Sequence, residues 1–309
     1  MGSRQTTHRG SADAARRTDR VATVDLHSHT IRSDGLLDPM TLVRAASDAG
    51  VRLLAITDHD TLAGYRDVVG SPGGIPPGLD LVPGVELNAI VSGHPTLWES
   101  EVHILGLGVD PANEAFEAIL ATQRQGRRVR FERMIERLAE LGLDIRAAVK
   151  EVAGPSTGTP SDENDALGRP TVARALMAIG AATSVEDAFS RYLARGRPGH
   201  VDREGLGPIE AIRAIRAAGG LPSLAHFSEA PQRPNVIREL VEAGLGGLEA
   251  HHLSFDAATA EAVGAVADAL GLVRTGGTDY HGDLGTYAEA HARLAIPSAV
   301  EDRVRAVLR

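Results

Sequence analysis

Short apolar runs rich in β-branched residues alternate along the chain with segments in which apolar residues recur every three or four positions. The runs are typical of buried strands, and the wider spacing is typical of helices. Repeated strand–helix units predict a parallel sheet, and the number of strands favours an α/β fold closed, or nearly closed, into a barrel. The expected strands are 21–26, 52–57, 79–82, 85–89, 102–107, 221–225, 247–250 and 272–275.

Capping residues mark the boundaries of the expected helices. Asp38 should cap a helix that has Pro39 in its first position and ends at Gly50. A longer helical pattern runs from Asn113 to residue 141, with Gly126 as a candidate break. The other expected helices are 171–179, 184–193, 208–218, 236–243, 257–270 and one at the C-terminus.

The periodicity and composition of the sequence change between residues 111 and 204. Helical patterns dominate there, and the segment 154–165 is rich in Gly, Pro, Ser, Thr and acidic residues, which predicts a loop or linker. We interpret 21–110 and 205–309 as the barrel and 111–204 as a helical insertion domain that covers its mouth. Residues 1–20 are polar and Arg-rich and predict a disordered tail.

The composition narrows the chemistry. The chain has 309 residues and no cysteine, so imidazole and carboxylate must hold any metal, which suits Mn, Fe or Zn. The formal net charge of −9 argues against broad nucleic-acid binding, so an anionic substrate needs local positive charge. No segment is apolar enough to span a membrane and the start lacks the apolar core of a signal peptide, so we expect a cytoplasmic protein.

Side chains that bind metals gather in four clusters, each placed where an apolar run ends. His27 and His29 are two residues apart, so on a strand they point to the same side and can chelate one ion. Glu86 follows a turn in an otherwise apolar run, where a buried carboxylate needs a compensating cation. The pattern predicts hydrolysis assisted by several metal ions. The candidate ligands are His27, His29, Asp34, His59, Glu86, His103, His226, Asp279 and His281.

Each candidate also has a structural interpretation. A histidine within a strand, such as His103, is more often hydrogen-bonded in the core than bound to a metal. Asp34 precedes a glycine and also suits a turn. Asp58 and Asp60 flank His59 and either cap a helix or orient its ring. Outside the candidate set remain Glu249, a carboxylate with less support, and four histidines interpreted as structural or surface residues: His94, His251, His252 and His291.

These clusters resemble the successive motifs of the PHP (polymerase and histidinol phosphatase) family over residues 21–282. The resemblance implies a distorted (β/α)7 TIM-like barrel that holds up to three metal ions. By position it implies three ligand sets: His27, His29, Glu86 and Asp279; Glu86, His103 and His226; and Asp34, His59 and His281. The resembling motifs are His27-Ser28-His29 with Ser33-Asp34-Gly35, Ile56-Thr57-Asp58-His59-Asp60, Pro83-Gly84-Val85-Glu86, His103-Ile104-Leu105-Gly106, Leu224-Ala225-His226 and Gly277-Thr278-Asp279-Tyr280-His281.

The insertion carries a narrower resemblance. Gly168-Arg169-Pro170 and residues 189–196 are similar to stand-alone bacterial phosphoesterases of the family. That subgroup includes 3′,5′-nucleoside bisphosphate phosphatases and 5′→3′ exoribonucleases that act on short RNA. The resemblance implies hydrolysis of nucleotide phosphate esters by a metal-bridged hydroxide, with two to three divalent transition-metal ions as cofactors.

Three arginines and two possible acids complete the expected site. Arg169 and Arg195 or Arg197 are suited to hold a phosphate bidentately. Asp58 and His200 are candidates for the acid that protonates the leaving group. The expected partner is a small anionic phosphate ester. The alternatives are a histidinol-phosphate or sugar-phosphate phosphatase, an amidohydrolase, or a non-catalytic, metal-stabilised binding module. The metal, the exact substrate and the oligomeric state stay open.

Overall fold

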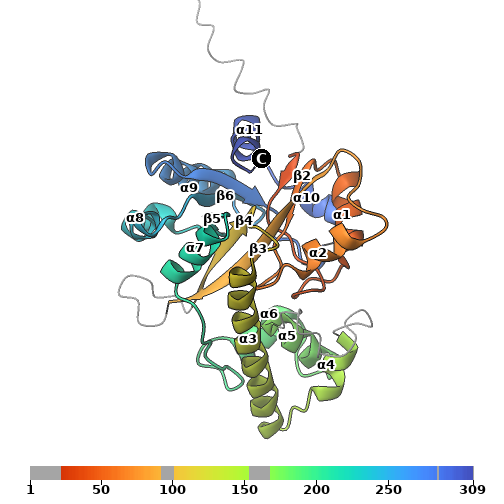
Figure 1. Cartoon of the computed structure of the whole chain (residues 1–309). Helices are drawn as coiled ribbons and strands as arrows, with labels where there is room; N and C mark the ends of the chain where they lie inside the picture. Colours follow the sequence, from red (N-terminus) through yellow and green to blue (C-terminus); the bar gives the residue numbers. More distant parts are fainter. Residues whose placement is uncertain (1–21, 92–100, 153–167, 284, 309) are drawn as a thin grey trace, which may run out of the picture.

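The computed structural model describes residues 22–91, 101–152, 168–283 and 285–308, which fold into a barrel with a helical extension (Figure 1). The predictions for the tail 1–20, the loop 154–165 and His94 lie outside the described residues. Seven strands form one sheet in chain order: β1 (Val24–Asp25), β2 (Leu53–Ile56), β3 (Asp80–Ile90), β4 (Glu101–Leu107), β5 (Leu221–Leu224), β6 (Gly247–His252) and β7 (Val273–Gly277).

The sheet nearly closes because its first and last strands adjoin. The Leu26 amide donates to the Gly276 carbonyl at 3.0 Å, and an isolated bridge joins Ser28 to Tyr280. Gly277 permits this approach, since a Cβ there would lie 2.4 Å from the Cβ of His27. The predicted seven-stranded α/β barrel is confirmed.

The expectation of a wholly parallel sheet is wrong, because β4 runs antiparallel to both β3 and β5. The other pairs are parallel. Only residues 91–100 separate β3 from β4, fewer than the dozen or so that a parallel crossover needs. The strands expected at 79–82 and 85–89 are also one strand. Pro83 pairs with Ile56 in its ladder, and a Cβ on Gly84 would lie 2.8 Å from the Ile56 carbonyl oxygen.

Helices surround the barrel (Figure 1). The prediction for the first is confirmed: the Asp38 side chain accepts from the Thr41 amide at 3.0 Å, and Gly50 follows the helix at a φ of 96°. The second was not predicted, because its N-cap Leu62 makes no side-chain capping bond. The helices are α1 (Pro39–Asp48), α2 (Ala63–Gly70), α7 (Pro208–Ala217), α8 (Pro234–Ala243), α9 (Ala257–Ala269), α10 (Tyr287–His291) and α11 (Ser298–Val307), with a short 3-10 turn, η2 (Ala230–Gln232).

The long helix α3 (Glu114–Glu140) joins the barrel to the insertion (Figure 1). Gly126 does not interrupt it. Its first turns carry Phe116 and Leu120 into the barrel core, whereas Phe131 and Leu138 belong to a separate core in the insertion. The insertion also contains α4 (Arg146–Val152), α5 (Arg169–Ala178), α6 (Val185–Ala188) and a π-helical turn, η1 (Phe189–Leu193). The residue bounds expected for the insertion stay a prediction. In the described part of the chain, no helix is long and apolar enough to cross a membrane.

Candidate active site

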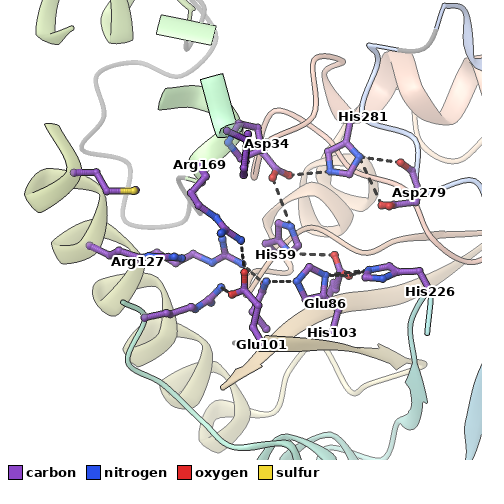
Figure 2. A pocket seen from close by; sticks show the side chains of 17 residues that line it. Asp34, His59, Glu86, Glu101, His103, Arg127, Arg169, His226, Asp279 and His281 are labelled. Atoms are coloured by element: carbon purple, nitrogen blue, oxygen red, sulfur yellow. Dashed lines mark hydrogen bonds and ion pairs between the residues drawn. The ribbon is translucent and has the colours of Figure 1, made fainter. Parts of the chain in front are cut away.

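All nine predicted ligands converge at one end of the barrel. His27 and His29 follow β1, His59 follows β2, and Asp34 lies in the loop before α1. Glu86 and His103 project from the neighbouring strands β3 and β4. His226 follows β5, and Asp279 and His281 follow β7. Strand ends far apart in the sequence therefore meet in one cluster (Figure 2).

Glu86 lies at the centre of this cluster. Its Oε1 is 2.7 Å from His103 Nδ1 and 3.4 Å from both His226 Nε2 and His27 Nε2. Its Oε2 is 3.0 Å from His59 Nδ1 and 3.2 Å from His29 Nε2. Burial alone would raise the pKa of Glu86, but the imidazoles led by His103 and His59 hold it well below its usual range. One carboxylate thus contacts five imidazoles and is ionised.

The remaining ligand atoms form groups that overlap the ligand sets implied by the resemblance, but His29 joins the third set and Glu86 is absent from the first. Asp279 Oδ1 lies 3.2 Å from the Nε2 atoms of both His27 and His29. Asp34 lies 3.3 Å from His281 Nε2 and 3.6 Å from His59 Nε2. In each group the donor atoms lie within 4.8 Å of one another: His27, His29 and Asp279; Glu86, His103 and His226; and His29, Asp34, His59 and His281.

Several buried ligand atoms have no hydrogen-bond partner among the described residues. They include the Nε2 atoms of His27 and His29, Asp34 Oδ1 and His59 Nδ1. A buried polar atom without a partner costs free energy, and a bound cation would remove that cost. Imidazole and carboxylate are ligands of divalent transition metals. The residues therefore fit divalent metal ions.

The electrostatics also match a metal centre. Burial lowers the pKa of His59 to about 4, so its ring is neutral near neutral pH. Burial opposes protonation of His281 as well, but the carboxylates of Asp34 and Asp279 raise its pKa to about 10. A metal that binds to His281 would have to displace the proton that this raised pKa favours.

Backbone strain is concentrated at this cluster. Among the described residues, only Asp60, His226 and Asp279 combine a side chain with a positive φ, of 54°, 33° and 51°. Such residues are uncommon and are found at functional sites that the surrounding structure holds in place. The Asp279 amide donates to the His27 carbonyl at 2.8 Å, which anchors the strained turn.

Arginines form the opposite wall of a cavity of about 280 Å³ above the cluster (Figure 2). Arg127 and Arg130 come from α3, Arg169 from the first position of α5, and Arg203 from the segment before α7. The ring of Phe189 lies 5.5 Å from the guanidinium carbon of Arg169. One cavity therefore brings candidate metal ligands of the barrel together with cations that come mainly from the insertion.

Two carboxylates hold three of these arginines: Arg127, Arg169 and Arg203. Asp60 is fully buried, and its Oδ2 accepts from Arg127 Nε at 2.5 Å and from Arg203 Nη2 at 2.6 Å. Glu101 accepts a hydrogen bond from Arg169 and lies 3.5 Å from Arg203 Nη1. Burial would raise the pKa of Glu101, but the arginines led by Arg169 lower it to about 2.

The arginines retain an excess of positive charge. Burial, followed by repulsion from Arg169, lowers the pKa of Arg130 to about 10. Burial, followed by repulsion from Arg127, lowers the pKa of Arg203 to about 10 as well. Repulsion between neighbouring guanidinium groups is relieved when an anion binds among them. This half of the cavity is therefore suited to a phosphate group.

Four predicted residues lie outside the cavity wall. Arg195 and Arg197 are exposed. His200 is buried, with Nδ1 facing the Leu193 carbonyl at 3.2 Å and Nε2 facing Asp202 at 3.2 Å. Asp58 is buried and accepts from the Thr30 amide and the Ser33 hydroxyl, both at 2.7 Å. These contacts tie Asp58 to the loop between His29 and Asp34. The catalytic and phosphate-binding roles expected for the four stay predictions.

Sequence reasoning missed several residues of the site. Glu249 is fully buried, 3.1 Å from His27 Nδ1, and accepts from the His226 amide at 2.7 Å. His252, interpreted as structural or surface, lies 3.5 Å from Asp279. A register shift between Glu249 and His251 turns Glu249 and His252 to the same side, which strict alternation would not do. Glu101, Arg127, Arg130 and Arg203 carried no motif that singled them out.

The chain is similar to proteins of known description, although no protein-family model matches it. The 5′-3′ exoribonuclease Rnm of Salmonella typhimurium is 38% identical over 68% of this chain and 67% of that protein. The 3′,5′-nucleoside bisphosphate phosphatase of Chromobacterium violaceum is 32% identical over 84% of this chain and 88% of that protein. A solved structure from Bifidobacterium adolescentis, described as a metal-dependent phosphoesterase, is 30% identical with a TM-score of 0.75 over 92% of this chain and 95% of that one.

Proposed function

Because the chain belongs to the PHP family of metal-dependent phosphoesterases and is a hydrolase of phosphoester bonds, we propose that its substrate is a nucleotide with a 5′-phosphate and a second phosphoryl group on O3′. A 3′,5′-bisphosphate and a short 5′-phosphorylated RNA both contain this unit. The observation that carries the proposal is the single cavity in which the metal-binding cluster faces four arginines. The names of the two relatives support it, since they denote a bisphosphate phosphatase and a 5′-3′ exoribonuclease.

The metal centre of the proposal holds two to three divalent ions from Mn, Fe or Zn. His27, His29, Glu86 and Asp279 would hold one, Glu86 with His103 and His226 a second, and Asp34, His59 and His281 a third. The donor groups and their orphaned buried atoms support this assignment. When bound, divalent ions supply Lewis-acid stabilisation of the phosphoryl oxygens and make attacking water more acidic.

The protein's own side chains orient the substrate. Arg169 and Arg130 would receive the 5′-phosphate, and the phosphoryl group on O3′ would lie against the metal cluster. Asp60 holds Arg127 and Arg203 from behind, because it is fully buried and does not line the cavity. Such preorganised cations favour a bound phosphate without a further cost of ordering long side chains.

The proposal is tested by comparing kcat/KM for adenosine 3′,5′-bisphosphate, adenosine 3′-monophosphate, adenosine 5′-monophosphate and histidinol phosphate on the manganese-loaded protein. We expect the bisphosphate to be preferred by tenfold or more, because a monophosphate leaves one half of the cavity empty. A small aryl phosphate reports the activity of the metal centre alone. A monophosphate that equals or exceeds the bisphosphate would show that the protein is a general phosphatase.

A further inference from the structure

Glu101 is an acidic residue in the wall of a cavity otherwise suited to anions. Its side chain is 10% exposed, and one oxygen, Oε2, is buried without a hydrogen-bond partner among the described residues. It also borders a smaller neighbouring cavity of about 160 Å³, which His103 and His226 line as well. The carboxylate therefore stands between the arginines and the metal-binding histidines (Figure 2).

The two carboxylates that contact the arginines occupy different positions. Asp60 holds Arg127 and Arg203 from the protein side and does not line the cavity. Glu101 contacts Arg169 and Arg203 from within the cavity wall. An entering anion therefore encounters Glu101 and leaves Asp60 undisturbed. Glu101 lies where the oxygens of a bound phosphate would meet Arg169.

The contacts of Arg130 leave it available to such an anion. Its Nε donates to the Val201 carbonyl at 2.8 Å, and no carboxylate forms an ion pair with it among the residues that the structure describes. Phe189 packs against Arg169 from the insertion side and restricts its position. The cavity thus presents one arginine already engaged by Glu101 next to one that is not.

We propose that Glu101 is a specificity-determining residue that selects a terminal, dianionic phosphate over a monoanionic phosphodiester. This inference rests on the proposed function, because it concerns the group that the arginines receive. A phosphomonoester carries close to two negative charges at pH 7, whereas a phosphodiester and an ionised carboxylate each carry one. Glu101 belongs to the same chain as the arginines and competes at a high effective concentration. A monoanion that displaces the Glu101 carboxylate from the arginines gains no electrostatic attraction, whereas a dianion does.

The selected substrate class is therefore the 5′-phosphorylated chain end. An internal nucleotide presents a phosphodiester on its 5′ side and would be rejected at the arginines by charge. A 5′-hydroxyl end would leave Glu101 in place. Competition from Glu101 for the arginines disfavours the monoanionic group, and a neutral 5′-hydroxyl gains no ion pair with them, so neither case requires a direct contact to the base or the sugar.

The test compares the wild type with Glu101→Gln on three substrates. These are adenosine 3′,5′-bisphosphate, its 5′-methyl ester, which has a monoanionic 5′ group, and adenosine 3′-monophosphate. In the wild type we expect kcat/KM for the bisphosphate to exceed that for the methyl ester by tenfold or more. In Glu101→Gln the ratio should fall at least fivefold, mainly because KM for the methyl ester decreases.

Matched variants separate charge from structure. Glu132→Gln makes the same chemical change at an exposed position of α3 and should leave the ratio unchanged. Glu101→Asp retains the charge and should keep the ratio within about threefold of the wild type. Glu101→Ser replaces the glutamine variant if that variant does not fold.

The two hypotheses fail in distinguishable ways. A wild type that does not prefer the bisphosphate over adenosine 3′-monophosphate contradicts the proposed function. A wild type with that preference, combined with a neutral Glu101 variant that keeps the dianion-to-monoanion ratio, contradicts only the inference. An equal rise of KM for the bisphosphate and its methyl ester, with KM for adenosine 3′-monophosphate unchanged, would likewise show that Glu101 merely anchors Arg169.

Discussion

The barrel and the insertion reach the same cavity in different ways. The barrel contributes ligands that follow parallel strands or, in Glu86 and His103, project from β3 and the antiparallel β4, and the order of the sheet brings them to one end of the barrel. The insertion contributes cations from the sides and ends of helices, and their position depends on how α3 and α5 pack. The chemistry of the site is therefore tied to topology, whereas its selectivity is tied to packing.

The two regions contact each other directly. Arg174 of α5 donates to the Asp34 carbonyl at 3.1 Å, and a Cβ on Gly168 would lie 3.3 Å from Asp34 Oδ2. Arg124 of α3 donates to the Asp60 carbonyl at 3.1 Å. The insertion thus touches the barrel at the loops that carry a metal-ligand candidate and the anchor of the arginines. Substitutions in the barrel should consequently affect metal binding, and substitutions of the arginines in the insertion should affect substrate selection.

The largest effect should follow Glu86→Gln in the barrel. Glu86 contacts five imidazoles, so its loss should disturb two ions and lower kcat by about 10²–10³-fold, the size of effect seen when one preorganised electrostatic partner is removed. Elemental analysis and kcat on an aryl phosphate measure this. Asp34→Asn, in contrast, should deplete one ion only. A Glu86→Gln variant that retains all its metal ions would contradict the assignment of Glu86 as a metal ligand.

Glu249→Gln should weaken metal binding without touching the arginines. Glu249 orients the His27 ring and holds the His226 amide, and loss of such an outer partner typically lowers metal affinity by about 10–100-fold. Competition with a fluorescent chelator measures the affinity. Glu261→Gln, at an exposed site of α9, is the matched control. KM for the bisphosphate at saturating metal should stay near the wild-type value. A large rise would show that substrate binding depends on the metal ligands more strongly than the contacts between the two regions indicate.

Arg169→Ala should affect substrate selection and leave the metal centre intact. One charge-assisted phosphate contact is worth about 1.5–3 kcal/mol, so KM for the bisphosphate should rise roughly tenfold to a hundredfold. KM for a small aryl phosphate should not change. Arg133→Ala, at an exposed position of α3 outside the cavity, should have no effect on either substrate. An equal rise of KM for both substrates would show that Arg169 is a structural residue. It would also contradict the assignment of substrate selection to the insertion.

The smallest effect concerns pH and stability. Ionised Glu101 is stabilised by Arg169 and Arg203, with a folded pKa of about 2 against an ordinary value of 4.5. Its stabilising contribution is complete above pH 4.5 and is lost as the pH falls towards 2. Urea unfolding should thus show that Glu101→Gln lowers the free energy of unfolding at pH 6, by a difference that shrinks below pH 4.5. A difference independent of pH would contradict the assignment of charge to Glu101.

The barrel, most of its strands and the nine candidate ligands could be predicted from the sequence alone. Local patterns suffice for these, because an apolar run, a cap such as Asp38 and a polar residue after a strand are written within a few positions. The pairing His27–His29 followed from strand alternation alone.

The direction of β4, the inward turn of His252 and the arginine wall could not be predicted without the folded structure. The direction of β4 depends on the short connection from β3, and His252 turns inward because of the register shift in β6. Arg127, Arg130 and Arg203 resemble ordinary charged residues in sequence, and an arginine becomes an anion ligand only when distant elements confine it. That confinement comes from long-range packing, for which a single sequence carries no local signal.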